Sequence, residues 1–205
     1  MKTNIQAPTL SFTNPKEFEE WLHAHHTSQE GLWVKFAKKA SGIASVSPEE
    51  TLEVALCYGW IDGQRKPFDE QYYLNKYTPR RKGSLWSKRN RAIAERLINE
   101  QKMQPSGMKE ITAAQADGRW ERAYDSSKTM ELPADFIAAV QQIPEAYAFF
   151  QTLNKTNLFA IQFRLQTAKK PETRALRMAK IVAQLKEGIK FHTLLLLLFF
   201  GGGQI

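Results

Sequence analysis

The chain has 205 residues and a formal net charge of +8 at pH 7, and 42% of its residues are hydrophobic against 24% charged. These values are ordinary for a globular protein, and the length allows one large domain or two small ones with a substantial core. A single cysteine, Cys57, excludes an internal disulfide and a cysteine-based zinc cluster, which fits a reducing compartment.

The termini bear on location. The N-terminus lacks the apolar run of a secretory signal peptide, and the longest apolar run, residues 194–200, is too short to cross a bilayer. We therefore expect a cytoplasmic protein with no membrane span. Residues 193–205 form an anomalous apolar tail, either a buried end segment or the product of a shifted reading frame, and we assign it no function.

The positive charge is concentrated in two segments. Residues 76–96 carry eight Lys or Arg against one Glu, and residues 164–190 carry eight against two. Two basic patches predict an anionic partner, whether a phosphorylated metabolite, a nucleic acid or an anionic membrane face. Solvated helix faces explain either patch equally well when it is taken alone.

Residues 11–26 begin with a turn and continue as the first predicted helix. Asn14 can cap this helix, and Pro15 suits its first turn. His23 and His26 lie three residues apart near its end, a spacing that can hold a metal ion. The neighbouring sequence offers no further ligand that completes a site, so we expect no bound metal.

A strand and a second helix follow. Residues 31–37 are aromatic and β-branched and begin with glycine, which predicts a strand. Residues 38–45 are expected to form a loop. Ser47 and Glu50 form a capping box for the next helix, and Gly59 ends it. Cys57, inside this helix, has no neighbouring base, so we expect a buried and unreactive thiol.

The next segment holds two predicted turns, a strand and a helix. Trp60–Gly63 is expected to turn the chain, and residues 68–77 then alternate as a strand. Residues 80–83 predict a basic turn, after which Ser84 is the expected N-cap of a helix. The shared face of that helix consists of Trp86, Asn90, Ile93 and Leu97.

The second half changes to helices whose starts are marked by prolines. Residues 106–116 predict a helix, and the polar residues 121–131 are the candidate linker. The last clear helix begins near Pro171 and ends at Gly188. Its expected inward residues are Leu176, Ile181, Val182 and Leu185. The predicted class is α+β, with a small mixed sheet and packed helices in residues 10–120 and an all-helical unit in residues 132–190.

Two groups of motifs are similar to those of one bacterial family. The N-terminal group is EVALCYGWIDG at 53–63 and YTPRR at 77–81, followed by Ser84, Trp86, Ser87 and Asn90. The C-terminal group is AKKPETR at 168–174, with Arg177. Over about residues 10–190 the chain resembles the bacteriocin-protection, YdeI or OmpD-associated family.

This resemblance implies a phenotype more than a chemistry. The family name implies protection against bacteriocins or cationic antimicrobial peptides, and association with an outer-membrane porin. It brings no catalytic residues to this chain. Because a basic surface repels cationic peptides, we expect any protection to be indirect.

A binding site is predicted around the basic turn at residues 80–83. Arg80 and Arg81 can supply forked donors to an anion, beside a helix start at which Ser84 and Ser87 lie. The expected ligand-binding residues are Trp60, Asp62, Tyr77, Arg80, Arg81, Ser84, Trp86, Ser87 and Asn90. In the structural alternative the indoles are core residues and Asp62 is a turn former paired with an arginine. For Asp62 the sequence favours this alternative.

The C-terminal motif is a second candidate site. Its basic residues are Lys169, Lys170, Arg174 and Arg177. Arg174 and Arg177 lie three residues apart on one helix face, and we expect them to pair with acids of the N-terminal unit before any ligand.

These patterns favour a non-catalytic stress- or resistance-associated protein that binds an anionic small molecule or an acidic partner surface through an Arg/Trp-lined cleft. Nucleic-acid binding by the two basic patches is the first alternative, although no known binding motif is present. An enzyme of unknown reaction is the second, although the sequence shows no metal set, phosphate loop or Ser/His/Asp set. We expect no cofactor.

Overall fold

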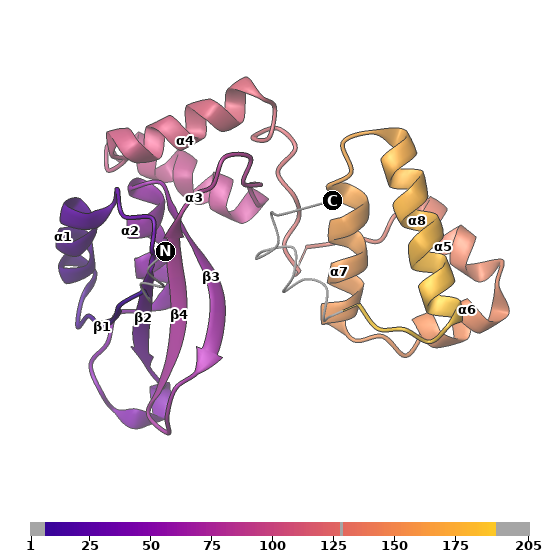
Figure 1. The fold of residues 1–205 in the computed structure, drawn as a ribbon, viewed down its shortest axis with the longest axis horizontal. Coiled ribbons are helices and arrows are strands. Elements are labelled where there is room, and N and C mark those ends of the chain that lie inside the picture. Colours follow the sequence, from indigo (N-terminus) through magenta and orange to yellow (C-terminus); the bar gives the residue numbers. More distant parts are fainter. Residues whose placement is uncertain (1–6, 128, 192–205) are drawn as a thin grey trace, which may run out of the picture. The chain divides into compact units, whose positions relative to one another are not determined.

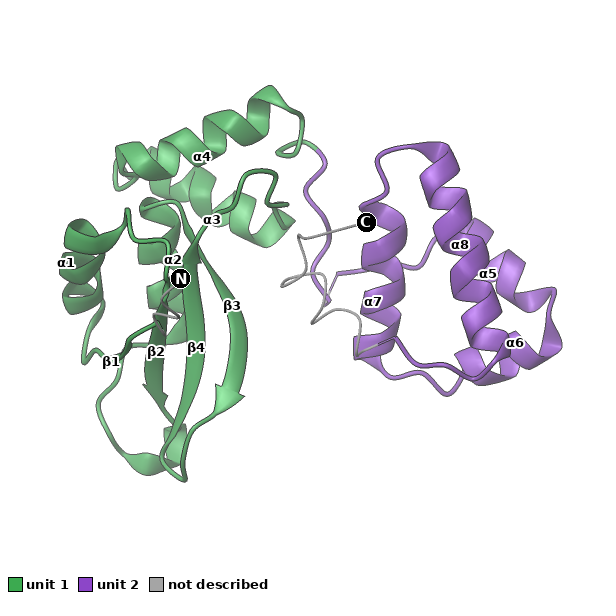
Figure 2. Cartoon of the chain, viewed as in Figure 1, with its two compact units in different colours: residues 1–121 green, residues 122–205 purple. Residues whose placement is uncertain are grey.

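A computed structural model describes residues 7–127 and 129–191 (Figure 1). The chain forms two compact units, residues 1–121 and residues 122–205 (Figure 2). Among the described residues, the first unit contains a sheet with helices and the second contains four helices, so the predicted α+β class is confirmed. The predicted apolar tail at residues 193–205 lies outside the described residues. Within the described part, no helix is long and apolar enough to cross a membrane.

The sheet of the first unit has four strands in the order β1-β2-β4-β3. Strand β1 (Thr9–Ser11) runs parallel to β2 (Leu32–Ala37), and β4 (Tyr72–Pro79) is antiparallel to both β2 and β3 (Trp60–Pro67). The predicted mixed sheet is therefore confirmed.

The predicted turn at Trp60–Gly63 is wrong, because β3 begins there. Trp60 and Ile61 pair with the end of β4, and a β-bulge lies between Asp62 and Arg65. The change of direction comes one residue earlier, at Gly59, whose φ of 76° suits glycine. Aromatic and β-branched side chains favour strands, and pairing with β4 outweighs the turn preference of Asp-Gly.

Helices α1 (Pro15–His25) and α2 (Pro48–Cys57) pack against one face of this sheet, and a short 3-10 turn, η1 (Lys39–Ser41), precedes α2. Their expected caps are present. The Asn14 side chain accepts the Glu17 N–H, and Ser47 and Glu50 form the capping box. These local signals were sufficient to predict where each helix begins, because each cap joins residues only three apart in the sequence.

Helices α3 (Lys88–Asn99) and α4 (Pro105–Ala116) complete the first unit. The predicted N-cap of α3 is wrong, because Ser87 and not Ser84 caps it: Ser87 Oγ accepts the Asn90 N–H at 3.1 Å. Ser84 Oγ instead accepts the Arg81 N–H at 3.0 Å and closes the basic turn. The helix starts late because Trp86 precedes it and is buried against Arg80 and Trp120.

The two serines should therefore differ in their effect on stability. Ser87→Ala removes the acceptor at the start of α3 and should lower the free energy of unfolding by about 1 kcal/mol. Ser84→Ala affects only the turn and should change it by less than about 0.5 kcal/mol. Urea denaturation of both variants measures the difference, and the reverse ranking would restore Ser84 as the cap.

The second unit is built from α5 (Ala134–Gln141), α6 (Pro144–Phe150), α7 (Lys155–Gln166) and α8 (Pro171–Lys186). Ile181, Val182 and Leu185 enter its core as predicted. The prediction for Leu176 is wrong, because it is 73% exposed. At about 100° per residue, Leu176 lies roughly 140° from Ile181 around the helix, so the two cannot share one face.

Candidate functional site

Two of the expected ligand-binding residues, Trp60 and Tyr77, lie in the core of the first unit. Trp60 is fully buried, and its Nε1 donates to the His26 carbonyl oxygen at 2.8 Å. Tyr77 is also fully buried, with its hydroxyl 2.7 Å from Thr51 Oγ1. Burial raises the pKa of Tyr77, against the hydrogen bond with Thr51, which lowers it. Both side chains have a structural role in holding α1 and α2 on the sheet.

Arg80 and Trp86 do come together. The guanidinium carbon of Arg80 lies 3.6 Å from the centre of the Trp86 ring, and Arg80 Nη1 donates to the Leu85 carbonyl oxygen at 3.2 Å. Trp86 in turn meets Trp120 edge-on, with ring centres 4.8 Å apart. Arg80 therefore lies beside the indole of Trp86. At 7% exposure, its side chain is largely covered by the protein.

Arg81, the neighbouring arginine, is exposed in the basic turn. Ser87 and Asn90 lie at the start of α3, where the Ser87 hydroxyl accepts the Asn90 N–H. The structure therefore divides the predicted set into a buried stack, an exposed turn and a helix cap.

The positive charges of Arg89 and Arg80 interact with the carboxyl group of Asp62. Although the residue is exposed, its carboxyl is surrounded by many protein atoms. This desolvation raises its pKa above the ordinary value, while Arg89 and Arg80 act in the opposite direction. Asp62 is thus a residue of strand β3, with Arg89 and Arg80 acting on its carboxyl, and the predicted role as a turn former is wrong.

Arg119 was not identified from the sequence. It is 5% exposed, its Nε donates to both carboxylate oxygens of Asp117 at 2.7 Å, and its Nη1 donates to the Ser84 carbonyl oxygen at 2.7 Å. It ties the basic turn to the end of α4. The segment Asp117–Trp120 predicts only a turn, because nothing local signals a partner 35 residues away.

The C-terminal basic residues form their contacts inside the second unit. Arg174 donates two hydrogen bonds to Asp135, at 2.6 and 2.8 Å, so its acid comes from α5 and not from the N-terminal unit. These bonds hold the pKa of Asp135 below its usual value. Arg177 donates to the Arg164 carbonyl oxygen at 2.8 Å. The two remaining residues of the patch, Lys169 and Lys170, are exposed just before α8.

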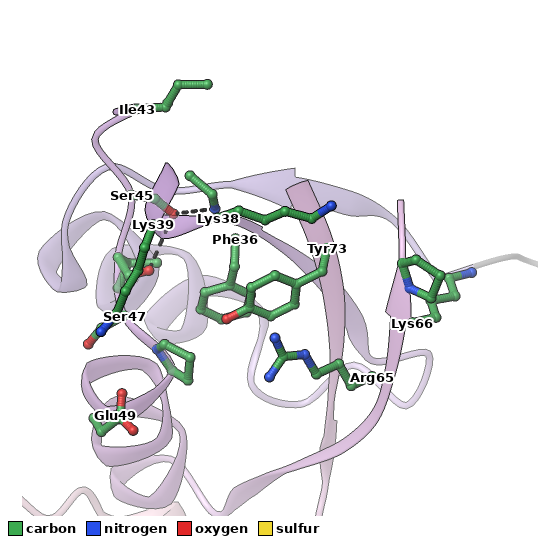
Figure 3. A pocket seen from close by; sticks show the side chains of 14 residues that line it. Phe36, Lys38, Lys39, Ile43, Ser45, Ser47, Glu49, Arg65, Lys66 and Tyr73 are labelled. Atoms are coloured by element: carbon green, nitrogen blue, oxygen red, sulfur yellow. Dashed lines mark hydrogen bonds between the residues drawn. The ribbon is translucent and has the colours of Figure 1, made fainter. Parts of the chain in front are cut away.

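A basic pocket that the sequence did not predict lies beside the sheet (Figure 3). It encloses about 890 Å³ between the β2, β3 and β4 strands and the start of α2. Phe36, Arg65 and Tyr73 come from the three strands, while Lys38 and Lys39 follow β2. We call this hollow the Arg65 pocket.

The wall of the Arg65 pocket is a three-layer stack. The Arg65 guanidinium carbon lies 3.7 Å from the centre of the Tyr73 ring, and Tyr73 stacks on Phe36 with ring centres 5.3 Å apart and an angle of 12°. No ion pair joins Arg65 to an acidic side chain in the described part of the chain. Burial raises the pKa of Tyr73, against the nearby Arg65 charge.

The rim of the Arg65 pocket is polar. Lys38 Nζ donates to the Asp69 carbonyl oxygen at 2.9 Å, and Lys39 is exposed in η1. The two serine hydroxyls are already engaged: Ser45 Oγ accepts the Ala37 N–H, and Ser47 Oγ accepts the Glu50 N–H. The lining includes four cationic residues, Lys38, Lys39, Arg65 and Lys66, against one carboxylate, that of Glu49, so this side is positive.

The residues of the Arg65 pocket carried a partial sequence signal. Residues 38–45 were expected to be only a loop, and the β3 strand was mistaken for a turn. Without β3 in place, its residue Arg65 has no predicted neighbour on β4. Had residues 60–67 been recognised as a strand, the alternation of side chains would have placed Arg65 and Lys66 on opposite faces of the sheet.

A smaller hollow of about 340 Å³ contains Cys57 together with Glu19, Glu53 and Lys102. Burial raises the pKa of Cys57 to about 11 from the ordinary value of 9.0, and the charges of Glu19 and Glu53 add to this rise. The described residues contain no group of three or more metal-binding side chains. The His23 and His26 rings instead contact Tyr58.

Native Cys57 should therefore resist alkylation. Iodoacetamide reacts with the thiolate, so labelling should be slow at pH 8 and should accelerate as the pH approaches about 11. Because the folded pKa is raised, the stability contributed by the neutral thiol is present below pH 9.0 and is lost as the pH rises toward 11. Mass spectrometry measures the single site, with denatured protein as control. Rapid labelling of the native protein at pH 8 would contradict the expected burial.

Comparison with known families divides the chain near the boundary between its two units. Residues 10–110 match a domain of unknown function (DUF8412), which includes the EVALCYGWIDG and YTPRR motifs. Residues 129–188 match the family described as bacteriocin-protection, YdeI or OmpD-associated. No curated protein and no solved structure matches the chain. The resemblance to this family is therefore found in the C-terminal helical unit, whereas the N-terminal motifs lie in the domain of unknown function.

Proposed function

We propose that the N-terminal unit binds an anionic small molecule in the Arg65 pocket, and that this binding underlies a stress- or resistance-associated role. The observation that carries the proposal is the stack of Arg65 on Tyr73 at 3.7 Å, with no described acidic side chain paired to the guanidinium. A guanidinium that lies flat on a ring keeps its N–H edges directed outward in a fixed plane. Those edges match a carboxylate or a phosphate.

The size and lining of the Arg65 pocket favour a metabolite. Small-molecule pockets typically enclose about 300–1,000 Å³ and combine apolar walls with a few placed polar groups. This pocket encloses about 890 Å³, with Phe36 and Tyr73 as the flat wall. The proposed ligand therefore has an anionic end at Arg65 and a planar or apolar part against the rings.

The charges that line the Arg65 pocket favour the same orientation of the ligand, with its anionic end at Arg65. Lys39 and Arg65 present positive charge from different elements, while Glu49 lies in the first turn of α2. An anion is attracted to the cationic side, and donor groups of the ligand would face Glu49. We propose binding rather than catalysis because the hydroxyls of Ser45 and Ser47 are already used within the backbone framework.

The Arg80–Trp86 stack is the second position proposed for the same ligand class. Its favouring observation is the guanidinium held 3.6 Å over an indole, beside the exposed Arg81. Arg80 itself is largely buried and donates to Leu85, so a ligand there depends on Arg81. An acidic partner surface would use the same exposed cations.

A thermal-shift screen of the full chain tests the proposal, with citrate, inorganic pyrophosphate and 4-hydroxybenzoate as the first probes. A bound anion should raise the melting temperature in a concentration-dependent way. Calorimetry on any hit should then show affinity weakened about tenfold or more by Arg65→Met, because a charge-assisted hydrogen bond contributes roughly 1.5–3 kcal/mol.

Arg81→Ala distinguishes the two proposed positions, because it removes one exposed arginine outside the Arg65 pocket. It should leave the affinity of a ligand bound in the Arg65 pocket unchanged. Weakening by Arg81→Ala alone would move the site to the basic turn. The proposal is rejected if no probe raises the melting temperature, or if Arg65→Met binds as the unmodified chain does.

A further inference from the structure

The second face of the sheet, opposite α1 and α2, gathers lysines and aromatic rings. Side chains alternate along a strand, so Lys66 lies on the opposite face from its neighbour Arg65. Lys35 and Lys66 flank Leu74 from the two neighbouring strands, and Lys76 pairs with Trp33. We call this surface the basic sheet face; its residues are Lys35, Lys66, Phe68, Tyr72 and Lys76, which surround Trp33, a ring largely buried with Ala7 and Leu74.

The cations on the basic sheet face lie over rings. Lys35 Nζ lies 3.9 Å from the centre of the Tyr72 ring and 4.7 Å from that of Phe68. Lys66 and Lys76 share Trp33, at 4.1 and 5.6 Å. None of the three lysines pairs with an acidic side chain in the residues that the structure describes.

The strand order and register separate the lysine charges of the basic sheet face from one another. Adjacent strands are about 4.8 Å apart, so Lys35 and Lys66, two strands apart, are separated by roughly 10 Å at their backbones. That width is too large for one phosphate and suits a polyanion. Phe68 is 52% exposed at the edge of the face and offers a ring for stacking.

We propose that the basic sheet face binds single-stranded nucleic acid. Such platforms combine basic groups that follow the phosphates with aromatic rings on which unpaired bases stack. Lys35, Lys66 and Lys76 supply the first, and Phe68 with Tyr72 supplies the second. A duplex keeps its bases stacked on one another, and an acidic peptide leaves the rings unused, so both fit this surface less well.

The basic sheet face and the Arg65 pocket lie on opposite faces of the sheet and share one residue, Lys66, which also lines the pocket. Arg65 and Lys66 are adjacent in β3 but point to opposite faces, and Figure 3 shows the Lys66 side chain directed away from the pocket. The inference therefore does not rest on the proposed small-molecule function, and each can fail without the other.

Fluorescence anisotropy with the full chain and a labelled oligothymidylate of about 12 nucleotides tests the inference, since site sizes of about 4–16 nucleotides are typical. Affinity should fall with salt, with a slope near −2 in log–log form, because each phosphate contact contributes roughly −0.7. Lys66→Met should reduce the slope by about 0.7. Phe68→Ala should weaken binding about fivefold or more without changing the slope, because stacking is not ionic.

Lys109→Met is the matched control, because Lys109 is an exposed lysine on α4, away from the sheet. It should leave binding unchanged, as should Arg65→Met. The inference is overturned by absence of binding, by equal losses for Lys109→Met and Lys66→Met, or by unchanged affinity of Phe68→Ala. It is also overturned if a duplex or a polyglutamate peptide competes as well as the single strand. Melting curves verify that each variant is folded.

Discussion

Gly107→Ala is expected to destabilise the first unit by about 2 kcal/mol or more, although alanine is the better helix former. Gly107 lies in α4, and a Cβ there would overlap the carbonyl oxygen of Cys57 and approach Met103 Sδ at 2.6 Å. The Cys57 carbonyl also accepts the Gln104 N–H at 3.1 Å, which fixes its position. Because the obstacle is backbone, α4 must move as a whole.

Whether Gly107→Ala raises or lowers stability shows whether helix propensity or tertiary packing dominates at this position. Propensity alone predicts a gain of about 0.5–1 kcal/mol for Gly→Ala within a helix. Overpacking predicts a fall in melting temperature on the order of 10 °C for a unit of this size.

Gly63→Ala is the matched control for Gly107→Ala, since its nearest contact, Lys76 O at 3.5 Å, is an ordinary one. Its stability should stay within about 0.5 kcal/mol of the unmodified chain. Thermal and urea unfolding measure both variants, and a stabilised Gly107→Ala would contradict the close packing of α4 on α2.

Phe136→Ala is expected to have the largest effect in the second unit, a loss of about 3–5 kcal/mol. Phe136 is fully buried in the helical core and meets the Phe150 ring edge-on at 6.0 Å. Removing the ring takes away its burial and leaves a cavity that the four helices can close only in part.

Leu176→Ala provides the comparison, because the sequence predicted an inward position for Leu176. Leu176 is 73% exposed, so its replacement by alanine removes little buried apolar surface. The change in the free energy of unfolding should stay within about 0.5 kcal/mol. Urea unfolding followed by circular dichroism measures both variants. Equal losses would mean that Leu176 is covered in solution, contrary to its place on α8.

The elements predicted best are those with local end signals. Asn14 and Ser47 cap their helices through bonds to residues three positions on, and Gly188 ends α8 with a φ of 70°. Ser84 and Ser87 offered the same capping chemistry, and only the burial of Trp86 decided between them. Trp60–Gly63 was mistaken for a turn because its strand partner, β4, lies beyond a further turn of the chain.

By itself the sequence determined the α+β class, the basic charge, the caps of α1 and α2, and the family resemblance of the C-terminal unit. Only the tertiary structure decided which cation meets which ring. Arg65 reaches Tyr73 through the register of β3 with β4, and Phe36 joins them from β2. A cap depends on neighbours along the chain, whereas these stacks depend on strand pairing and on the side of the sheet that each residue faces.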